Sequence, residues 1–370
     1  MVDTRNIAIF LATSGHSGVD RIMTNFIHEV IRRELPVDLL RISNHGPYLD
    51  PVPAGLNIVE LGTSHVNSSL PALISYLRKQ RPFVLLTDKD RVNRIAILAR
   101  MIAGSDTRLV VRTGTTVSVD MKHRSWFQQW LQIFSYRYLY PKADAIIVPS
   151  AGAAEDLARI GNLQRNRVRV LVSPVLTDSI ITQASSPVDH AWLASSETIP
   201  VILGVGELSP RKDFGTLLKA FAKVRQGRLC RLIILGKGKQ TDDLQNLAMQ
   251  LGIENDMSLP GFVDNPYSYM SKASMLVLTS RWEGSPVVLM EALALGLPVV
   301  ATDCPSGPRE ILENGRLGAL VPVGDVEALA EKISDTLNAP PDAAFLRSAA
   351  QKYHVTKSAD QYLNAMGIES

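Results

Sequence analysis

The chain has 370 residues, of which 46% are apolar and 20% charged, and its formal net charge is +3. This composition is typical of a soluble globular protein and excludes a disordered or fibrous chain, while the length favours two domains over one core. The two cysteines, Cys230 and Cys304, match no metal-binding spacing, so we expect a reducing, cytoplasmic environment and no disulfides. We also expect no nucleic-acid partner.

In the first half, short runs rich in β-branched residues alternate with amphipathic helical patterns. The expected strands are IAIF, VDLLRI, FVLLT, LVVR, AIIV and VRVLV, and the expected helices are 19–34, 69–80, 92–103, 125–140 and 151–160. The first run is too short for a signal-peptide core or a membrane span, and no later run reaches spanning length.

The second half repeats this alternation after a segment rich in Ser, Thr and Pro at 176–200, which we interpret as a linker. Its strands are VILGVG, RLIILG, MLVLTS and PVVAT, and its helices are 214–225, 241–251, 286–295 and 325–337. Such alternation predicts parallel sheets covered on both faces, and hence an α/β fold of two doubly wound, Rossmann-like domains facing across a cleft. The domains are expected at 1–178 and 179–345, with a helix in 346–370 packing back on the first.

The stretch SRWEGSPVVLMEALALGLPVVAT, residues 280–302, combines two glutamates with a tight turn. Ser285 is the expected N-cap and Pro286 the first residue of a helix, while Gly284 lets backbone approach a ligand closely. The free N–H groups at the start of this helix favour a phosphate. Glu283 in the loop and Glu291 in the helix each carry a carboxylate that accepts hydrogen bonds from a diol, such as a sugar ring or a ribose.

This stretch resembles the Glu-x7-Glu signature of the retaining glycosyltransferases of family 4, which have the GT-B fold. The resemblance extends through GVGELSPRKDF, through LGKGKQTDDLQNLAMQLGIENDMSLPGFVDNPYSYMSKA and through CPSGPREILENGRLGALVPVGDVEALA, and so covers most of residues 201–337. In the first half it is carried by GHSGVDRIMTNFI and ADAIIVPSAGAAEDL.

The resemblance implies roles for several residues. Lys212 is implied to bind the diphosphate of a nucleotide-sugar donor, with Arg211 beside it, and a fixed cation there would stabilise the charge of the leaving diphosphate. Gly206 and Gly18 match glycine positions facing the donor. The family usually has Gly-Arg-Leu where this chain has Gly206-Glu207-Leu208, so Arg211 is the candidate for the missing arginine's role.

We therefore expect an enzyme that transfers a sugar from a UDP- or GDP-type donor to a hydroxyl of a glycan or lipid-linked acceptor, with retained anomeric configuration and without a metal or other cofactor. The resemblance favours a front-face route, in which the leaving phosphate takes the acceptor's proton, and a role in polysaccharide, lipopolysaccharide or other glycolipid assembly. Two alternatives are a nucleotide-sugar epimerase of the same fold and a non-catalytic nucleotide-sugar-binding protein. The acceptor candidates are Arg112 and His123, which lie at and after the strand LVVR.

The segment LLTDKDR carries Asp88 and Asp90 at the spacing of the metal-binding Asp-x-Asp motif found in the other glycosyltransferase fold. That fold has a single mixed sheet, and here the helix end and Lys212 already supply positive charge. We therefore interpret the two aspartates as part of a polar loop, and no residue is assigned to a metal.

Charge is distributed unevenly along the chain. Up to Asp178 there are 22 basic and 15 acidic residues (+7), and thereafter 17 and 21 (−4). Within the first half, MKHRSWFQQWLQIFSYRYLYPK repeats aromatic residues every four positions among basic ones. Two interpretations remain open: a helix at an anionic membrane surface, which would make the protein peripheral to the inner face of the cytoplasmic membrane, or a core helix with basic edges.

Overall fold

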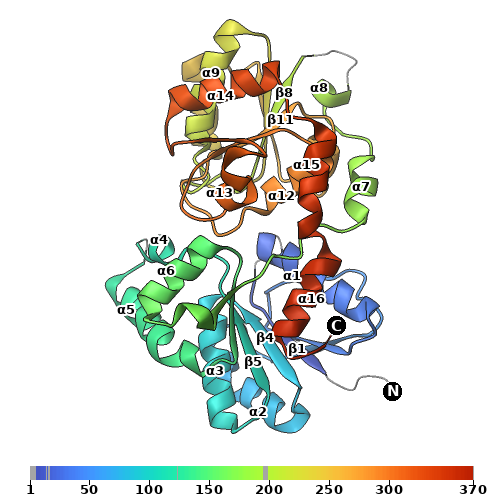
Figure 1. Ribbon diagram of the computed structural model, residues 1–370, viewed down its shortest axis with the longest axis vertical. Helices are drawn as coiled ribbons and strands as arrows, with labels where there is room; N and C mark the ends of the chain where they lie inside the picture. Colours follow the sequence, from blue (N-terminus) through green and yellow to red (C-terminus); the bar gives the residue numbers. More distant parts are fainter. Residues whose placement is uncertain (1–5, 14, 16, 123, 195–198, 370) are drawn as a thin grey trace. The chain divides into compact units, whose positions relative to one another are not determined.

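The computed structural model describes residues 6–13, 15, 17–122, 124–194 and 199–369, and it divides into two compact units (Figure 1). The first unit comprises Met1–Val175 with Tyr353–Ser370, and the second comprises Leu176–Lys352. The chain thus enters the second unit three residues before the expected boundary at 178/179 and leaves it at Tyr353, later than the expected 346. The later exit arises because helix α15 (Ala343–Ala350) packs on α12 (Val287–Leu295) of the second unit.

The sheet of the first unit has seven parallel strands in the order β3-β2-β1-β4-β5-β6-β7. Its strands are β1 (Ile7–Phe10), β2 (Val37–Arg41), β3 (Leu56–Glu60), β4 (Val84–Asp88), β5 (Arg108–Arg112), β6 (Ala145–Val148) and β7 (Val168–Val170). Its helices are α1 (Gly18–Arg32), η1 (Asn67–Ser69), α2 (Leu70–Gln80), α3 (Asp90–Ala103), α4 (Val117–Met121), α5 (Trp126–Phe134), η2 (Ser135–Leu139), η3 (Tyr140–Lys142), α6 (Ala151–Gly161), η4 (Arg165–Arg167), η6 (Gln351–Tyr353, at the junction) and α16 (Val355–Ala365).

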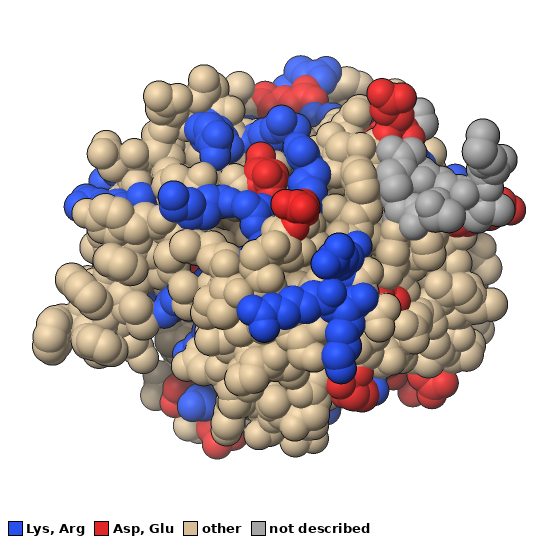
Figure 2. Space-filling model, turned by 90° about the horizontal axis from the view of Figure 1, so that it is seen from below, with Lys and Arg blue, Asp and Glu red and all other residues tan. Residues whose placement is uncertain are grey.

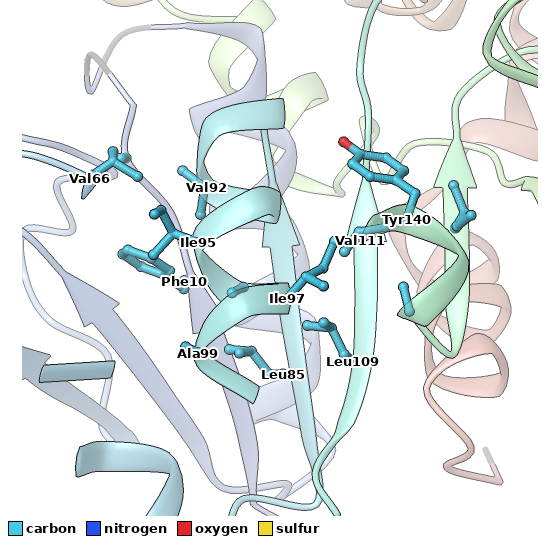
Figure 3. Packing of buried hydrophobic residues seen from close by; sticks show 14 of the residues in the cluster. Phe10, Val66, Leu85, Val92, Ile95, Ile97, Ala99, Leu109, Val111 and Tyr140 are labelled. Atoms are coloured by element: carbon cyan, nitrogen blue, oxygen red, sulfur yellow. The ribbon is translucent and has the colours of Figure 1, made fainter. Parts of the chain in front are cut away.

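Two layers of helices cover this sheet because strand side chains alternate between its faces. Figure 3 shows α3 lying against one face, with Val92, Ile95 and Ala99 near Phe10 and Leu85. On the opposite face α16 packs against α1, and the rings of Phe26 and Tyr362 lie 5.4 Å apart. The last helix therefore completes the first unit.

The sheet of the second unit has six parallel strands in the order β10-β9-β8-β11-β12-β13. Its strands are β8 (Val201–Val205), β9 (Arg231–Leu235), β10 (Met257–Gly261), β11 (Met275–Leu278), β12 (Val299–Thr302) and β13 (Ala319–Val321). Besides α12 and α15, its helices are α7 (Ser179–Ala184), α8 (Ala191–Ala194), α9 (Phe214–Gly227), α10 (Thr241–Leu251), α11 (Pro266–Met270), α13 (Pro308–Ile311), η5 (Glu313–Gly315) and α14 (Val326–Asn338).

Both sheets are doubly wound, as expected from the alternation of strands and helices. Each sheet has a switch point, the position from which the chain adds successive strands first toward one edge of the sheet and then toward the other. This point lies between β1 and β4 in the first unit and between β8 and β11 in the second. Loops that leave the carboxyl ends of such a pair diverge to opposite faces of the sheet and leave a ligand-binding crevice between them. The residues that follow β8 and β11 are therefore the first place to look for a site.

Candidate functional site

The loops after β8 and β11 bring together the residues that the sequence singled out. Lys212 Nζ donates a 2.6 Å hydrogen bond to Glu283 Oε1, and Arg211 Nη1 donates a 2.8 Å bond to Glu283 Oε2. Ser280 Oγ donates to Glu283 Oε1 at 2.7 Å. One carboxylate thus holds two cations at the switch point of the second sheet.

The two loops are also joined through their backbones. Thr279 Oγ1 donates to the carbonyl of Lys212 at 2.8 Å, and the amide of Arg281 donates to the carbonyl of Arg211 at the same distance. Arg281 Nε in addition donates to Asp213. These bonds fix the backbone that carries the two cations relative to the loop after β11 that carries Glu283.

Burial decides how the cluster is charged. Lys212 is 8% exposed and Glu283 6%, whereas the side chain of Arg211 is one-third exposed. Burial by itself would raise the pKa of Glu283, but the charges of Lys212 and Arg211 outweigh it and hold that pKa below its ordinary value. Glu283 is therefore an ionised carboxylate at neutral pH, able to accept hydrogen bonds but not to act as a proton donor.

Cys304 lies close to this cluster. Burial, with the negative charge of Glu283 added to it, raises the pKa of the Cys304 thiol to about 12. The thiol therefore stays protonated and is a poor nucleophile. Cys230 is likewise buried and unpaired.

Gly206 is required for the position of Lys212. A Cβ at residue 206 would lie 2.9 Å from Lys212 Cε, so the glycine leaves room for the lysine side chain to cross the end of β8. A Cβ at Gly236, after β9, would lie 1.8 Å from the carbonyl oxygen of Gly206. These two glycines let the backbones at the carboxyl ends of β8 and β9 approach closely.

The turn before α12 differs from the expectation in one respect. The helix begins at Val287, Pro286 occupies the N-cap position, and no side chain caps the helix. Ser285 is therefore not the N-cap, because a proline with β-region backbone angles follows it and moves the helix start by one residue. The helix ends where expected, with Gly296 in the left-handed conformation.

A loop that follows β12 supports this turn. Ser306 Oγ donates to the carbonyl of Gly284 at 3.3 Å, and the amide of Glu283 donates to the carbonyl of Pro305 at 3.5 Å. Gly307 packs so closely that a Cβ there would lie 2.7 Å from the Pro286 ring. Ser306 and Gly307 both have positive φ angles, and this backbone is what supports the 283–286 turn.

Glu291 is 1% exposed on α12 and accepts a 2.8 Å hydrogen bond from the hydroxyl of Tyr267 on α11. A buried carboxylate requires such a partner. The sequence pointed to Glu291 but not to Tyr267, because residues 24 positions apart reveal no pairing by their spacing. Ser306, 22 residues after Gly284, was missed for the same reason. Ser280 lies only three residues before Glu283 and was also missed.

Glu207, which replaces the family's arginine, is exposed, while its neighbour Leu208 is buried in the core. Its side chain therefore points away from the interior, whereas Arg211 reaches Glu283. Arg211 supplies the second positive charge of the cluster, and its expected role in place of the missing arginine stays a prediction.

Gly18 is the first residue of α1 in the first unit and follows the N-cap Ser17. Asp20 is buried and closes a capping box by accepting a 2.8 Å bond from the amide of Ser17, and Thr13 also donates to it. The turn after β1 is thus held by side chains, with Gly18 exposed at the helix start. Its expected donor contact stays a prediction.

The structure corrects the expected acceptor role of Arg112. Its guanidinium is 1% exposed, forms an ion pair with Asp88, and donates to the Tyr362 hydroxyl at 3.0 Å and to Ser173 Oγ at 3.1 Å. All three nitrogens are engaged inside the first unit, so Arg112 is a structural residue that ties α16 to the sheet. His123, the other acceptor candidate, lies outside the described residues.

The carboxylates of the two aspartates of LLTDKDR bind different partners. Asp88 pairs with Arg112, while the carboxylate of Asp90 accepts bonds from the hydroxyls of Tyr140 at 3.1 Å and Thr113 at 3.4 Å. Burial raises the pKa of Asp90. Within the described ranges no group of three His, Cys, Asp or Glu side chains is placed to hold a metal ion.

Two family models match the chain. The model for glycosyl transferases group 1 matches residues 186–353, and the model for the glycosyl transferase 4-like domain matches residues 17–173. Together they take in both units, and the first spans the whole Lys212–Glu283 cluster.

Relatives over most of the length are glycosyltransferases. The chain is 29% identical over 342 residues, 90% of each chain, to the N-acetylgalactosamine-N,N'-diacetylbacillosaminyl-diphospho-undecaprenol 4-alpha-N-acetylgalactosaminyltransferase of Campylobacter jejuni. It is 28% identical to the lipopolysaccharide core biosynthesis glycosyltransferase LpsE of Rhizobium meliloti, over 59% of this chain and 60% of that one.

Solved structures share the fold at low sequence identity. The complex of Anabaena Alr3699/HepE with UDP-glucose matches with a TM-score of 0.77 and 19% identity, over 98% of this chain and 99% of that one. The apo lipopolysaccharide outer core galactosyltransferase WaaB matches with a TM-score of 0.74 and 19% identity, over the same shares of the two chains. At this identity the likeness establishes the fold alone.

Proposed function

Because the chain belongs to the family 4 glycosyltransferases of the GT-B fold, we propose that it transfers a sugar from a nucleotide-sugar donor to an acceptor hydroxyl and retains the anomeric configuration. The observation that carries this proposal is the buried cluster of Lys212, Arg211 and Glu283 at the switch point of the second sheet. A UDP- or GDP-type donor suits it, because two cations and the start of α12 offer positive charge to a diphosphate.

The proposal assigns a role to each of the site residues of the second unit. Lys212 and Arg211 bind the diphosphate, and Glu283 both orients them and accepts hydrogen bonds from the sugar hydroxyls. Gly206 and the backbone of Gly284–Pro286 let the donor approach the loops closely. Glu291, held by Tyr267, accepts from the ribose.

The proposed reaction is a front-face displacement. The bond between the sugar's anomeric carbon and the diphosphate oxygen breaks, the acceptor oxygen bonds to that carbon on the same face, and the acceptor's proton passes to the leaving phosphate oxygen. The leaving group gains negative charge as the bond breaks, and Lys212, which Glu283 holds in place, stabilises that charge. We assign no step to a metal ion.

The acceptor is proposed to be a glycan carried on a lipid. The support is the name of the relative in C. jejuni, which describes a substrate linked to diphospho-undecaprenol, and the relative described as a lipopolysaccharide core enzyme. A lipid-linked acceptor would place the reaction at the inner face of the cytoplasmic membrane. No helix in the described part of the chain combines the length and the apolar character needed to cross a bilayer.

A panel of nucleotide sugars tests the reaction class. Incubation with UDP- and GDP-sugars, with and without a lipid-linked glycan acceptor, should release nucleotide from one donor and much faster when acceptor is present. Formation of an epimeric sugar would indicate the epimerase, and donor binding without turnover would indicate a binding protein.

Nucleotide release should persist in excess EDTA, because the proposed reaction assigns no step to a metal ion. Loss of release in EDTA with rescue by manganese would contradict the metal-free route.

The two glutamates should separate sugar transfer from nucleotide binding. Glu283→Gln is expected to lower turnover while nucleoside diphosphate affinity stays the same or rises, because Lys212 and Arg211 lose their carboxylate but stay available to phosphate. Glu291→Gln, the matched change in α12, is expected to weaken nucleotide binding itself. Calorimetric titration with the nucleotide and initial rates measure both, and loss of nucleotide binding in Glu283→Gln would contradict the assignment.

A further inference from the structure

Helix α5 and the π-helical turn η2 that follows it expose a row of aromatic side chains. The exposed fractions are 79% for Trp126, 54% for Phe127, 56% for Trp130, 39% for Phe134 and 61% for Tyr138. Neighbouring rings in this row lie with their centroids 5.0–6.2 Å apart. We call these five residues the aromatic row. The core-helix interpretation of this segment is thereby wrong, because a core helix would bury these rings.

Helix α5 meets the first unit through an inner side on which Gln132 is buried and Ile133 packs against the hydrophobic core. Gln132, on its inner side, is 1% exposed and accepts a hydrogen bond from Arg94 of α3 at 3.2 Å, while the aromatic row faces outward. A surface helix usually buries its apolar side and exposes its polar one. A contiguous apolar patch on the outside of a protein indicates a surface that binds a partner protein or a membrane.

The surroundings of the aromatic row are basic. Between residues 122 and 142 the sequence has four basic residues and no acidic one, and Lys122, Arg137 and Lys142 are exposed. The first unit as a whole carries 23 basic and 16 acidic residues, a charge of +7. Figure 2 shows that Lys and Arg side chains predominate over Asp and Glu on the face seen from below.

We propose that the aromatic row docks on the surface of a lipid bilayer that contains anionic lipids. Indole and phenol side chains favour the headgroup region, where the ring is apolar and the N–H or O–H stays hydrated. Exposed lysine and arginine beside them attract anionic headgroups. Arg124 is paired with Asp120, but Lys122, Arg137 and Lys142 are exposed beside the aromatic row. This combination of exposed rings and excess basic charge favours a lipid surface over a protein partner. The proposal does not depend on the donor or on the reaction.

Vesicle flotation with the full-length protein tests the proposal. Binding is expected to vesicles of phosphatidylcholine with phosphatidylglycerol, to be much weaker with phosphatidylcholine alone, and to fall as salt is raised. Trp126→Ser with Trp130→Ser should lower the bound fraction at least about tenfold, because the two largest apolar anchors are lost. Changing Lys122, Arg137 and Lys142 to serine should cost about fivefold per residue.

The matched control is Leu229→Ser with Met249→Ser, which removes apolar side chains of similar exposure, 51% and 57%, from the second unit. It should bind vesicles like the wild type. Thermal unfolding of the double tryptophan variant should stay near wild type, and a large fall would show that the rings pack in the fold and overturn the proposal. Equal binding to neutral and anionic vesicles would overturn it, as would a dimer in size-exclusion chromatography that the tryptophan changes abolish without any vesicle binding.

Discussion

Replacing Lys212 by alanine is expected to slow sugar transfer by at least about 100-fold, which corresponds to about 2.7 kcal/mol of transition-state stabilisation. Lys212 is 8% exposed and its ammonium lies 2.6 Å from Glu283, so in the proposed reaction it would stabilise the leaving diphosphate from a position that is already fixed. In the variant Glu283 keeps only Arg211 as a charged partner among the bonds described above. Initial rates with the donor found in the panel measure the effect.

Lys223 provides the control for this experiment. It lies on α9, eleven residues along the chain from Lys212, and pairs with Glu327 at the surface, where its side chain is 46% exposed. Lys223→Ala removes the same charge from the same unit and should leave the rate within about twofold of wild type, as expected for a surface ion pair of small energy. A wild-type rate in Lys212→Ala would contradict the proposal that Lys212 binds the diphosphate.

Breaking the buried pair between Asp88 and Arg112 should strongly destabilise the first unit. Asp88→Ala leaves a guanidinium that is 1% exposed without its counter-charge, and removing one partner of a buried ion pair typically costs about 3–5 kcal/mol. Burial alone would lower the pKa of Arg112, but Tyr362 and Asp88 raise it, so the arginine is charged in the wild type. A guanidinium does not lose its proton in proteins, so Asp88→Ala leaves a buried charge without its partner. Urea unfolding followed by amide exchange in β4 and β5 localises the loss to this unit.

The same sheet contains a matched pair at its surface. Arg41 and Glu60 occupy directly opposed positions at the ends of β2 and β3, as Asp88 and Arg112 do in β4 and β5, but their side chains are 29% and 50% exposed. Glu60→Ala should therefore cost less than about 1 kcal/mol. Adding Arg112→Met to Asp88→Ala should recover much of the loss, because no unpaired charge then remains. Equal costs for Asp88→Ala and Glu60→Ala would contradict the structural role given to Arg112.

The sequence predicts the central strands of both sheets because they are buried on both faces and read as continuous apolar runs. It misses β3, β10 and β13, which lie at sheet edges: β3 alternates between exposed and partly buried residues, β10 contains Pro260, and β13 has only three residues. Such strands owe their conformation to their neighbours more than to local pattern.

The site is predictable where chemistry follows a strand end, as for Lys212 and Glu283, since carboxyl ends of parallel strands meet at one edge. The spacing of residues along the chain does not predict which distant side chains a residue contacts. Arg112 is placed at a strand end like a ligand-binding residue, yet Asp88, Ser173 and Tyr362 surround it inside the unit. Ser285 precedes a proline that itself takes the N-cap position, which composition alone does not distinguish.

The most direct test of the central claim is a crystal structure of the protein with the nucleoside diphosphate that the donor panel identifies. We expect the diphosphate oxygens within hydrogen-bonding distance of Lys212 Nζ and the Arg211 guanidinium, at the carboxyl ends of β8 and β11. Density for the nucleotide at any other place in the molecule, with Lys212 and Arg211 still engaged only by Glu283, would contradict it.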